Sequence, residues 1–227
     1  MYREIRTTAD GSHTLFIPEL NEPYHSVNGA ITESEHIFIR NGLLFMKKEK
    51  ISILEFGFGT GLNALLTAME AKKRELSIHY TAIEKYPLTT KEVASLNYPQ
   101  ILGEEANPLF IKIHEASWDE NIEIFPGFTL HKINNGFLET DHFPVTDLVY
   151  FDAFAPEIQP ELWSEELFKK IARNMNNNGI LVTYSSKGSV KRALQSAGFN
   201  VEKVPGPPGK REITRAILTN LNNSQKG

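Results

Sequence analysis

The stretch ILEFGFGTGLN, residues 53–63, decides the fold of this chain. A short apolar run that contains Glu55 leads into three glycines at every second position, Gly57, Gly59 and Gly61. The apolar run predicts a buried strand, and the apolar periodicity of the residues after it predicts a helix. Glycine at a turn from strand to helix permits a tight bend and a close approach of the backbone to a ligand. The stretch therefore predicts a ligand site between the first core strand and the first core helix.

Strand and helix patterns alternate along the rest of the chain. The sequence predicts strands at residues 51–56, 79–84, 128–133, 146–153, 179–184, 199–204 and 212–219. It predicts helices at residues 62–73, 87–97, 164–175 and 189–198. Helices between strands imply right-handed crossovers and a mainly parallel sheet covered on both faces. The loop at residues 205–211 is too short for a crossover, so the last strand is expected to run antiparallel to its neighbour.

A mostly parallel seven-stranded sheet with an antiparallel last strand resembles the Rossmann-like α/β fold of class I S-adenosylmethionine-dependent methyltransferases.

Two helix ends carry local signals. Ser164 is a predicted N-cap, with Glu165 and Glu166 in the first turn of its helix. The run NNNG at residues 176–179 suits a left-handed C-terminal cap.

Length and composition favour one domain. The chain has 227 residues, of which 41% are apolar, and no compositional break divides it. We expect a single domain over residues 1–227, with an N-terminal cap segment at 1–50 and the core at 51–220. The N-terminus lacks the apolar stretch of a signal peptide, and no uncharged apolar run approaches the ~20 residues of a membrane span. A cytoplasmic protein without membrane contact is expected.

Composition also excludes several kinds of site. The chain has no cysteine, and its seven histidines show no short metal-ligand spacing, so no metal site is predicted. The formal net charge of −4 gives no overall attraction to nucleic acid. A contact with RNA would therefore require a local basic patch.

The glycine turn predicts a nucleotide-like ligand other than a dinucleotide. A dinucleotide fingerprint requires G-x-G-x-x-G, but Leu62 stands at its third glycine position, which disfavours a nicotinamide oxidoreductase. Glu84 ends the second predicted strand, and an acid roughly 20 residues past the turn can accept the hydroxyls of a ribose. Lys85 follows at the mouth of the same cleft. The alternative for Glu84 is a solvated charge at a strand end.

The segment YFDAFAPE, residues 150–157, ends the fourth predicted strand, where open parallel sheets place their ligands. Asp152 offers a proton acceptor, and Phe154 and Pro156 offer apolar walls. An acceptor of this kind suits an amine nucleophile, because an alkylamine has a pKa of about 10 and reacts only when neutral. The alternative for Asp152 is a loop residue that caps the next helix.

Segments along nearly the whole chain resemble the methyltransferase domain of the MnmC family, the bifunctional tRNA 5-methylaminomethyl-2-thiouridine biosynthesis proteins, in the stand-alone form called MnmD. These segments are residues 8–15, 24–39, 55–63, 83–88, 118–128, 151–163, 188–199 and 209–212. The resemblance implies S-adenosylmethionine as cofactor. It also implies methylation of the aminomethyl group on C5 of the wobble uridine of tRNA, in the anticodon region.

The resemblance assigns roles residue by residue. It implies that Asp152 and Phe154 meet the aminomethyl uridine. Residues that would contact the cofactor are Glu55, Gly57, Gly59, Gly61, Asn63, Glu84 and Lys85, with Tyr24 and Glu33 from the N-terminal segment. The chain departs from the family pattern at INNG, residues 133–136, where the family usually has an aspartate for the adenine amino group. Asn135, or its neighbour Asn134, would accept that hydrogen bond instead. Trp118 and Trp163 are expected either to wall the site or to pack in the core.

A basic patch for tRNA is expected on the cofactor side of the sheet. Lys210 and Arg211 lie at the tip of the predicted last hairpin, and Lys187 precedes a helix on the same side. Residues 47–50, which contain three lysines, precede the first core strand on the opposite side and are expected to be a solvated charge run.

Three other functions stay open from the sequence: a spermidine-synthase-like aminopropyltransferase, another amine N-methyltransferase, and a binding module without activity. No flavin domain is expected in this chain, because no second glycine fingerprint follows another strand and the methyltransferase segments occupy its length. The chain is therefore expected to act on aminomethyluridine and to leave the carboxymethylaminomethyl form unchanged.

Overall fold

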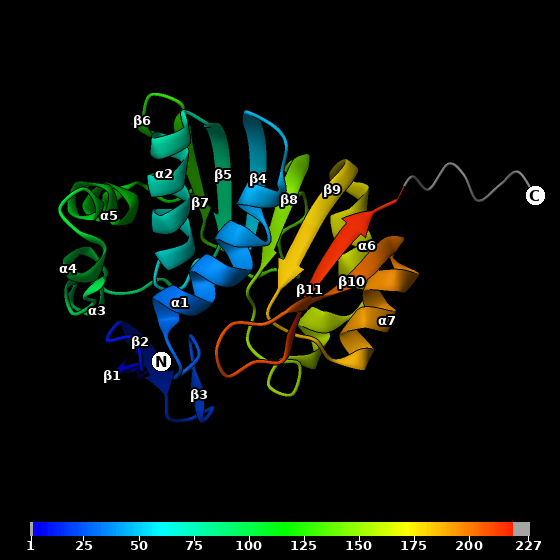
Figure 1. Cartoon of the computed structure of the whole chain (residues 1–227), viewed down its shortest axis with the longest axis horizontal. Coiled ribbons are helices and arrows are strands. Elements are labelled where there is room, and N and C mark those ends of the chain that lie inside the picture. Colours follow the sequence, from blue (N-terminus) through cyan, green and yellow to red (C-terminus); the bar gives the residue numbers. More distant parts are fainter. Residues whose placement is uncertain (1, 220–227) are drawn as a thin grey trace, which may run out of the picture.

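A computed structural model describes residues 2–219, and Met1 and residues 220–227, which the sequence assigns to the same domain, lie outside the described residues. Its centre is an eight-stranded sheet with the order β10-β11-β9-β8-β4-β5-β7-β6 (Figure 1). The strands are β4 (Lys50–Phe56), β5 (Ser77–Ile83), β6 (Asn121–Phe125), β7 (Phe128–Ile133), β8 (Thr146–Phe151), β9 (Met175–Thr183), β10 (Phe199–Pro205) and β11 (Glu212–Leu218).

The sheet has the predicted directions. Strands β7, β5, β4, β8 and β9 run parallel, and β11 is antiparallel to both β9 and β10. The prediction of seven strands is one short, because β6 pairs antiparallel with β7 at the edge of the sheet. β6 is short and buries only one of its five residues, so it lacks the run of buried apolar residues that identifies a core strand.

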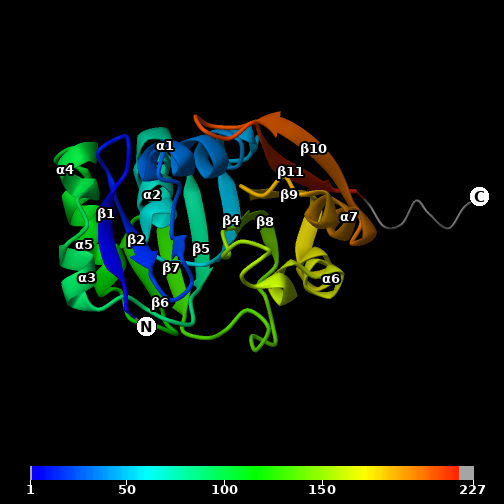
Figure 2. The same cartoon turned by 90° about the horizontal axis from the view of Figure 1, so that it is seen from below.

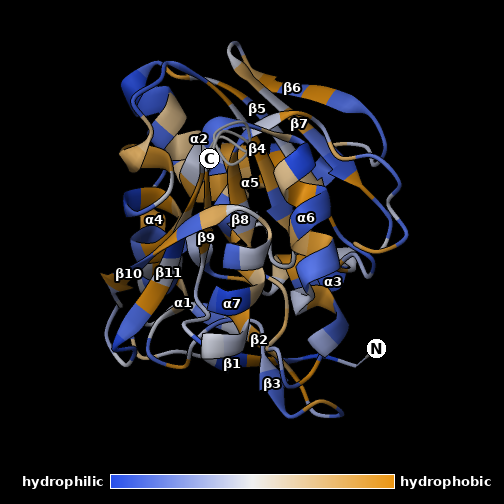
Figure 3. Cartoon of the chain, turned by 90° about the vertical axis from the view of Figure 1, so that its right-hand side faces the viewer, coloured by the Kyte–Doolittle hydropathy of each residue, from blue (hydrophilic) through white to orange (hydrophobic). Residues whose placement is uncertain are grey.

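Helices cover both faces of the sheet, and each face has its own apolar cluster. Successive residues of β4 alternate between the clusters: Ile53 packs on one face and Leu54 on the other. Figure 2 shows α6 and α7 on one side of the sheet, and the hydropathy colours of Figure 3 show hydrophilic residues on the outward side of both helices. The core helices are α2 (Leu62–Arg74), α3 (Thr90–Ala94), α4 (Tyr98–Leu102), α5 (Ala106–Glu115), η3 (Pro160–Trp163), α6 (Glu165–Arg173) and α7 (Gly188–Ser196).

One predicted helix cap is confirmed and the other is wrong. The hydroxyl of Ser164 accepts a hydrogen bond from the backbone N–H of Leu167 at the start of α6. The run NNNG does not end this helix, because α6 ends at Arg173 and β9 already begins at Met175. The side chain of Asn176 donates to Asp147 at 2.8 Å, which ties this run to the start of β8.

The N-terminal cap segment lies over the carboxyl ends of the parallel strands (Figure 1). Asp10 organises this segment, because its carboxylate accepts hydrogen bonds from the backbone N–H groups of Ser12 and Thr32. Thr32 lies 22 residues further along the chain than Asp10. The N-terminal cap segment consists of β1 (Glu4–Thr7), β2 (His13–Ile17), β3 (Glu22–Pro23), α1 (Ala30–Ser34), the π-helix η1 (Glu35–Arg40) and the 3₁₀ turn η2 (Leu43–Phe45).

Candidate active site

The three glycines after β4 all adopt left-handed backbone angles, with φ of 95° at Gly57, 49° at Gly59 and 70° at Gly61. A Cβ at Gly57 would lie 2.7 Å from the carbonyl oxygen of Asp152, so the turn after β4 touches the backbone after β8. A Cβ at Gly59 would face the ring of Tyr24 at 3.2 Å. Glycine is therefore required here both by backbone angle and by space.

Glu84 follows β5, and its carboxylate is oriented by two backbone groups. The N–H of Gly59 donates to one oxygen at 3.0 Å, and the N–H of Tyr86 donates to the other at 2.8 Å. A carboxylate oxygen can accept more than one hydrogen bond. Glu84 can therefore still accept hydroxyl donors from a ligand beside the glycine turn, as the sequence predicts.

A cavity of about 450 Å³ opens at the carboxyl ends of the parallel strands, a volume within the range of small-molecule sites. The N-terminal segment and the loops after β4, β5, β7, β8 and β9 enclose it. The predicted site residues that line it are Tyr24, Glu33, Gly57, Gly59, Asn63, Glu84, Lys85, Asp152, Phe154 and Lys210. The structure thus brings most of the predicted residues to one cavity.

Asp152 lies at the end of a buried polar chain. The side-chain amide of Asn63 donates to Asp152 at 2.9 Å and to Glu55 at 3.0 Å, so one residue of α2 links both carboxylates. Burial raises the pKa of Asp152 to about 7, and the negative charge of Glu33 adds to this shift, whereas the hydrogen bond from Asn63 and the charge of Lys210 oppose it. Asp152 therefore exchanges a proton near neutral pH, as a general base does.

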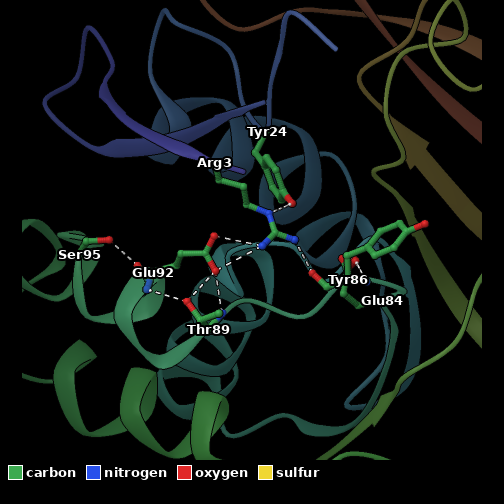
Figure 4. A network of polar contacts seen from close by, with 7 residues as sticks. All are labelled: Arg3, Tyr24, Glu84, Tyr86, Thr89, Glu92 and Ser95. Carbon is green, nitrogen blue, oxygen red and sulfur yellow. Dashed lines mark hydrogen bonds and ion pairs between the residues drawn. The ribbon is translucent and has the colours of Figure 1, made fainter. Parts of the chain in front are cut away.

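Tyr24 crosses the cavity between the glycine turn and Phe154. Its ring meets that of Phe154 edge-on, with 5.3 Å between the centroids. Figure 4 shows how the hydroxyl is held: the guanidinium of Arg3 donates to it at 2.8 Å. The same guanidinium donates to the carboxylate of Glu92 at 3.1 Å and to the carbonyl oxygen of Tyr86 at 2.6 Å. Arg3 therefore joins the N-terminal sheet to the loop that carries Glu84.

The sequence did not single out Arg3, because its role depends on contacts more than 80 residues along the chain. It also missed Phe137, Leu138 and Tyr184, which line the cavity. A signal exists for the first two, since an apolar pair directly follows the INNG turn after β7.

Several predicted residues lie outside the lining of the cavity. Glu55 is fully buried behind Asn63, and burial raises its pKa well above the usual range. Gly61 faces the ring of His114, and the side-chain oxygen of Asn135 accepts from the backbone N–H of Gly136. Glu55 and Gly61 therefore support the turn from behind. The adenine contact of Asn135 stays a prediction.

The predicted basic patch is divided in the structure. Lys210 turns into the cavity and pairs with Glu33, with 2.6 Å between Nζ and Oε1. Lys187 forms an ion pair with Glu157, whereas Arg211 is exposed. The expected contact with phosphate therefore depends mainly on Arg211.

Both tryptophans lie outside the lining of this cavity. Trp163 is buried, packs against Phe151, and donates its indole N–H to the carbonyl oxygen of Phe154 at 2.8 Å. Trp118 packs at the edge of the other apolar cluster. Among residues 47–50, Lys48 reaches Asp147 at the opposite end of β8 from Asp152.

The charges of the cavity suit a cationic ligand. Carboxylates outnumber ammonium groups in the lining, and its two lysines already have partners, Lys85 with Glu139 and Lys210 with Glu33. An excess of negative charge around a ligand site attracts positive charge. Over residues 2–219, no group of His, Asp or Glu side chains is placed to hold a metal ion, and no helix is long and apolar enough to span a membrane.

Comparison with known protein families shows that this chain is similar to methyltransferases. The family model described as S-adenosyl-L-methionine-dependent methyltransferase matches residues 112–219. The tRNA 5-methylaminomethyl-2-thiouridine biosynthesis bifunctional protein MnmC of Pseudoalteromonas atlantica is 32% identical over an alignment 249 positions long. This alignment covers 98% of this chain and 35% of that protein. Its counterpart in Burkholderia thailandensis is 33% identical, with 88% of this chain and 33% of that protein covered.

A solved structure extends the similarity to the fold. The crystal structure of MNMC2 from Aquifex aeolicus is similar with a TM-score of 0.79 and 30% identity, and the match covers 95% of this chain and 70% of that one. The chain spans about a third of the length of the curated relatives that it matches.

Proposed function

This chain belongs to the MnmC methyltransferase family, and from that premise we propose that it methylates the aminomethyl group on C5 of wobble uridine 34 in tRNA, giving 5-methylaminomethyl(-2-thio)uridine. The observation that carries the proposal is the carboxylate of Asp152, whose pKa is about 7 and which lines one cavity with the glycine turn. An amine acceptor needs such a base next to the methyl donor.

The cofactor of the family is S-adenosylmethionine, and the cavity fits it. When bound, it supplies an electrophilic methyl group. Any other side chain at Gly57 or Gly59 would press on the backbone of Asp152 or on the ring of Tyr24, and Glu84 offers acceptor oxygens for ribose hydroxyls. The excess of carboxylates in the lining suits the sulfonium and ammonium charges of this cofactor.

Other residues of the same lining would handle the acceptor. An alkylammonium ion has a pKa of about 10 and must lose a proton before its nitrogen can attack. Ionised Asp152 accepts that proton near neutral pH, because its pKa of about 7 makes it a stronger base than an ordinary aspartate. Phe154 and Tyr24 contribute aromatic rings to the lining, where they exclude water and offer apolar surface to a base.

Arg3 is expected to support cofactor binding through Tyr24 and the loop after β5. Replacing Arg3 with methionine should weaken S-adenosylmethionine affinity about tenfold, which corresponds to about 1.4 kcal/mol, because Tyr24 and the carbonyl oxygen of Tyr86 lose their guanidinium donor. The rate at saturating cofactor should change less than about threefold, since Arg3 lies outside the lining of the cavity.

Calorimetry and steady-state kinetics measure these two effects of the Arg3 variant. Arg6→Met is the matched control, because Arg6 lies in strand β1 just after Arg3, pairs with Glu4 and packs over the ring of Phe16. An Arg3 variant with the parent's affinity, or one that loses rate rather than affinity, would remove Arg3 from this role.

The proposed reaction is tested with purified chain, S-adenosylmethionine and tRNA that carries aminomethyluridine. Mass spectrometry of the nucleosides should show a gain of one methyl group at that uridine. Transfer RNA that carries carboxymethylaminomethyluridine should stay unchanged, because removal of the carboxymethyl group requires an oxidant and methyl transfer supplies no oxidant. Putrescine with decarboxylated S-adenosylmethionine tests the aminopropyltransferase alternative. Product in that arm, and none with tRNA, would overturn the proposal.

A further inference from the structure

Lys210 is placed by a hairpin that bends toward the cavity. The turn between β10 and β11 is closed by hydrogen bonds from Lys210 N to Pro207 O at 2.9 Å and from Gly206 N to Arg211 O at 3.2 Å. His36 of η1 contacts the carbonyl oxygen of Pro205 at 2.8 Å, which holds the base of the hairpin against the N-terminal segment. The hairpin therefore presents Lys210 to the cavity, while its neighbour Arg211 stays exposed.

Glu33 receives Lys210 from the other side of the cavity. Glu33 is buried in α1, and its second oxygen accepts the backbone N–H of Ser26 at 2.7 Å. The ammonium group of Lys210 lies 2.6 Å from the first oxygen of Glu33 and 4.3 Å from the centre of the Tyr184 ring. The hydroxyl of Tyr184 donates to the carbonyl oxygen of Ala153 at 2.8 Å, which places this ring beside Asp152. Both members of the ion pair are therefore fixed in the lining of the cavity that also contains Asp152.

We propose that Lys210 and Glu33 together set the protonation state of Asp152, Lys210 favouring the carboxylate and Glu33 favouring the acid. Both are positioning residues that act through Asp152. The proposal deepens the proposed function, since the ionised form of Asp152 is the one that accepts the proton of the amine. The titration itself is a property of the free protein and can be measured without any substrate.

Electrostatics gives the two residues opposite signs. Burial is the largest cause of the raised pKa of Asp152, the charge of Glu33 raises it further, and Lys210 lowers it. The other polar groups around Asp152 are Asn63 from α2, with Glu55 behind it, and Tyr184 after β9. Burial raises the pKa of Tyr184, and the negative charge of Asp152 raises it further, so the hydroxyl of Tyr184 stays neutral. The remaining ionisable side chains of the lining are Glu22, Tyr24, His25, Glu84, Lys85, Tyr86, Glu139 and Glu161.

Two single variants should therefore move the titration in opposite directions. Lys210→Met should raise the midpoint of Asp152 by about one pH unit, and Glu33→Gln should lower it by a similar amount. The double variant should titrate between the two single variants. Lys210→Arg keeps the positive charge and should retain the parent midpoint, whereas Arg211→Met is a control for the hairpin, since Arg211 is exposed.

The direct measurement is a ¹³C carboxyl titration of the free protein by NMR, with Asp152→Asn to assign the signal. In the methyl-transfer assay, the pH below which the rate falls should shift in the same direction as the midpoint. Binding of tRNA to Lys210→Met should keep the salt dependence of the parent, because a residue that pairs with Glu33 neutralises no phosphate. Arg211→Met should reduce that dependence instead.

Midpoints of Lys210→Met and Glu33→Gln that coincide with the parent midpoint would overturn the proposal. A loss of salt dependence in Lys210→Met without a change in midpoint would make Lys210 a phosphate contact. If Lys210→Met fails to fold, the two other variants still test the proposal. The midpoint of Asp152 should be lowered in Glu33→Gln and unchanged in Lys210→Arg. Opposite shifts in a chain that does not methylate tRNA would uphold this inference and refute the proposed function.

Discussion

Replacing Asp152 with asparagine is expected to slow methyl transfer by a factor of 10² or more while leaving S-adenosylmethionine affinity nearly unchanged. Asparagine keeps a carbonyl oxygen that can accept the hydrogen bond from Asn63, so the buried chain to Glu55 stays intact. It has no site that takes a proton near neutral pH. The variant therefore loses the base and keeps the packing.

The pH dependence identifies the cause of the loss. In the parent, the rate should rise as pH increases through about 7, because Asp152 becomes ionised over that interval. In the variant, residual activity should keep rising toward alkaline pH, where the amine loses its proton to solvent. Single-turnover rates over a pH series measure both profiles. Asp147→Asn, at the opposite end of β8, is the control and should keep the parent profile. A variant that matched the parent rate at neutral pH would show that Asp152 is not the proton acceptor.

Local sequence patterns predict the central sheet and one side of the site. The apolar run before Gly57 predicts β4, and the strand predicted at 128–133 is β7. Asp152 and Glu84 could be predicted to line the same site, because the carboxyl ends of parallel strands lie at the same edge of a sheet. These predictions depend only on residue type, period and strand direction, all of which are local properties.

The contact between Lys210 and Glu33 could not be predicted in the same way. Lys210 and Glu33 are 177 positions apart and meet only because η1 holds the base of the last hairpin. A lysine beside an arginine at a hairpin tip has the same local pattern whether it faces solvent or a cavity. The short strands β1, β2 and β3 were missed for a related reason, since they are stabilised by pairing with one another within the N-terminal segment rather than by their own periodicity.

Replacing Gly59 with valine is expected to weaken S-adenosylmethionine binding at least 10²-fold, about 2.7 kcal/mol. Gly59 has a φ of 49°, where a β-branched residue is strained, and its Cβ would lie 3.2 Å from the ring of Tyr24. The valine methyl groups would extend into the cavity beside the glycine turn. A shift of the turn would also break the 3.0 Å hydrogen bond from Gly59 N to Glu84, so the ribose acceptor would lose its orientation.

Gly103→Val separates the loss of space from the strain of the backbone. Gly103 has a φ of 97°, and a Cβ there would meet nothing within 4 Å, so its variant carries backbone strain at an exposed position away from the cavity. Both variants should be destabilised by about 1–3 kcal/mol, which thermal unfolding measures. Calorimetry with S-adenosylmethionine should show a loss of affinity for Gly59→Val alone. Parent-like affinity in a folded Gly59→Val protein would place the cofactor away from this turn, and equal losses in both variants would attribute the effect to strain rather than to the shape of the cavity.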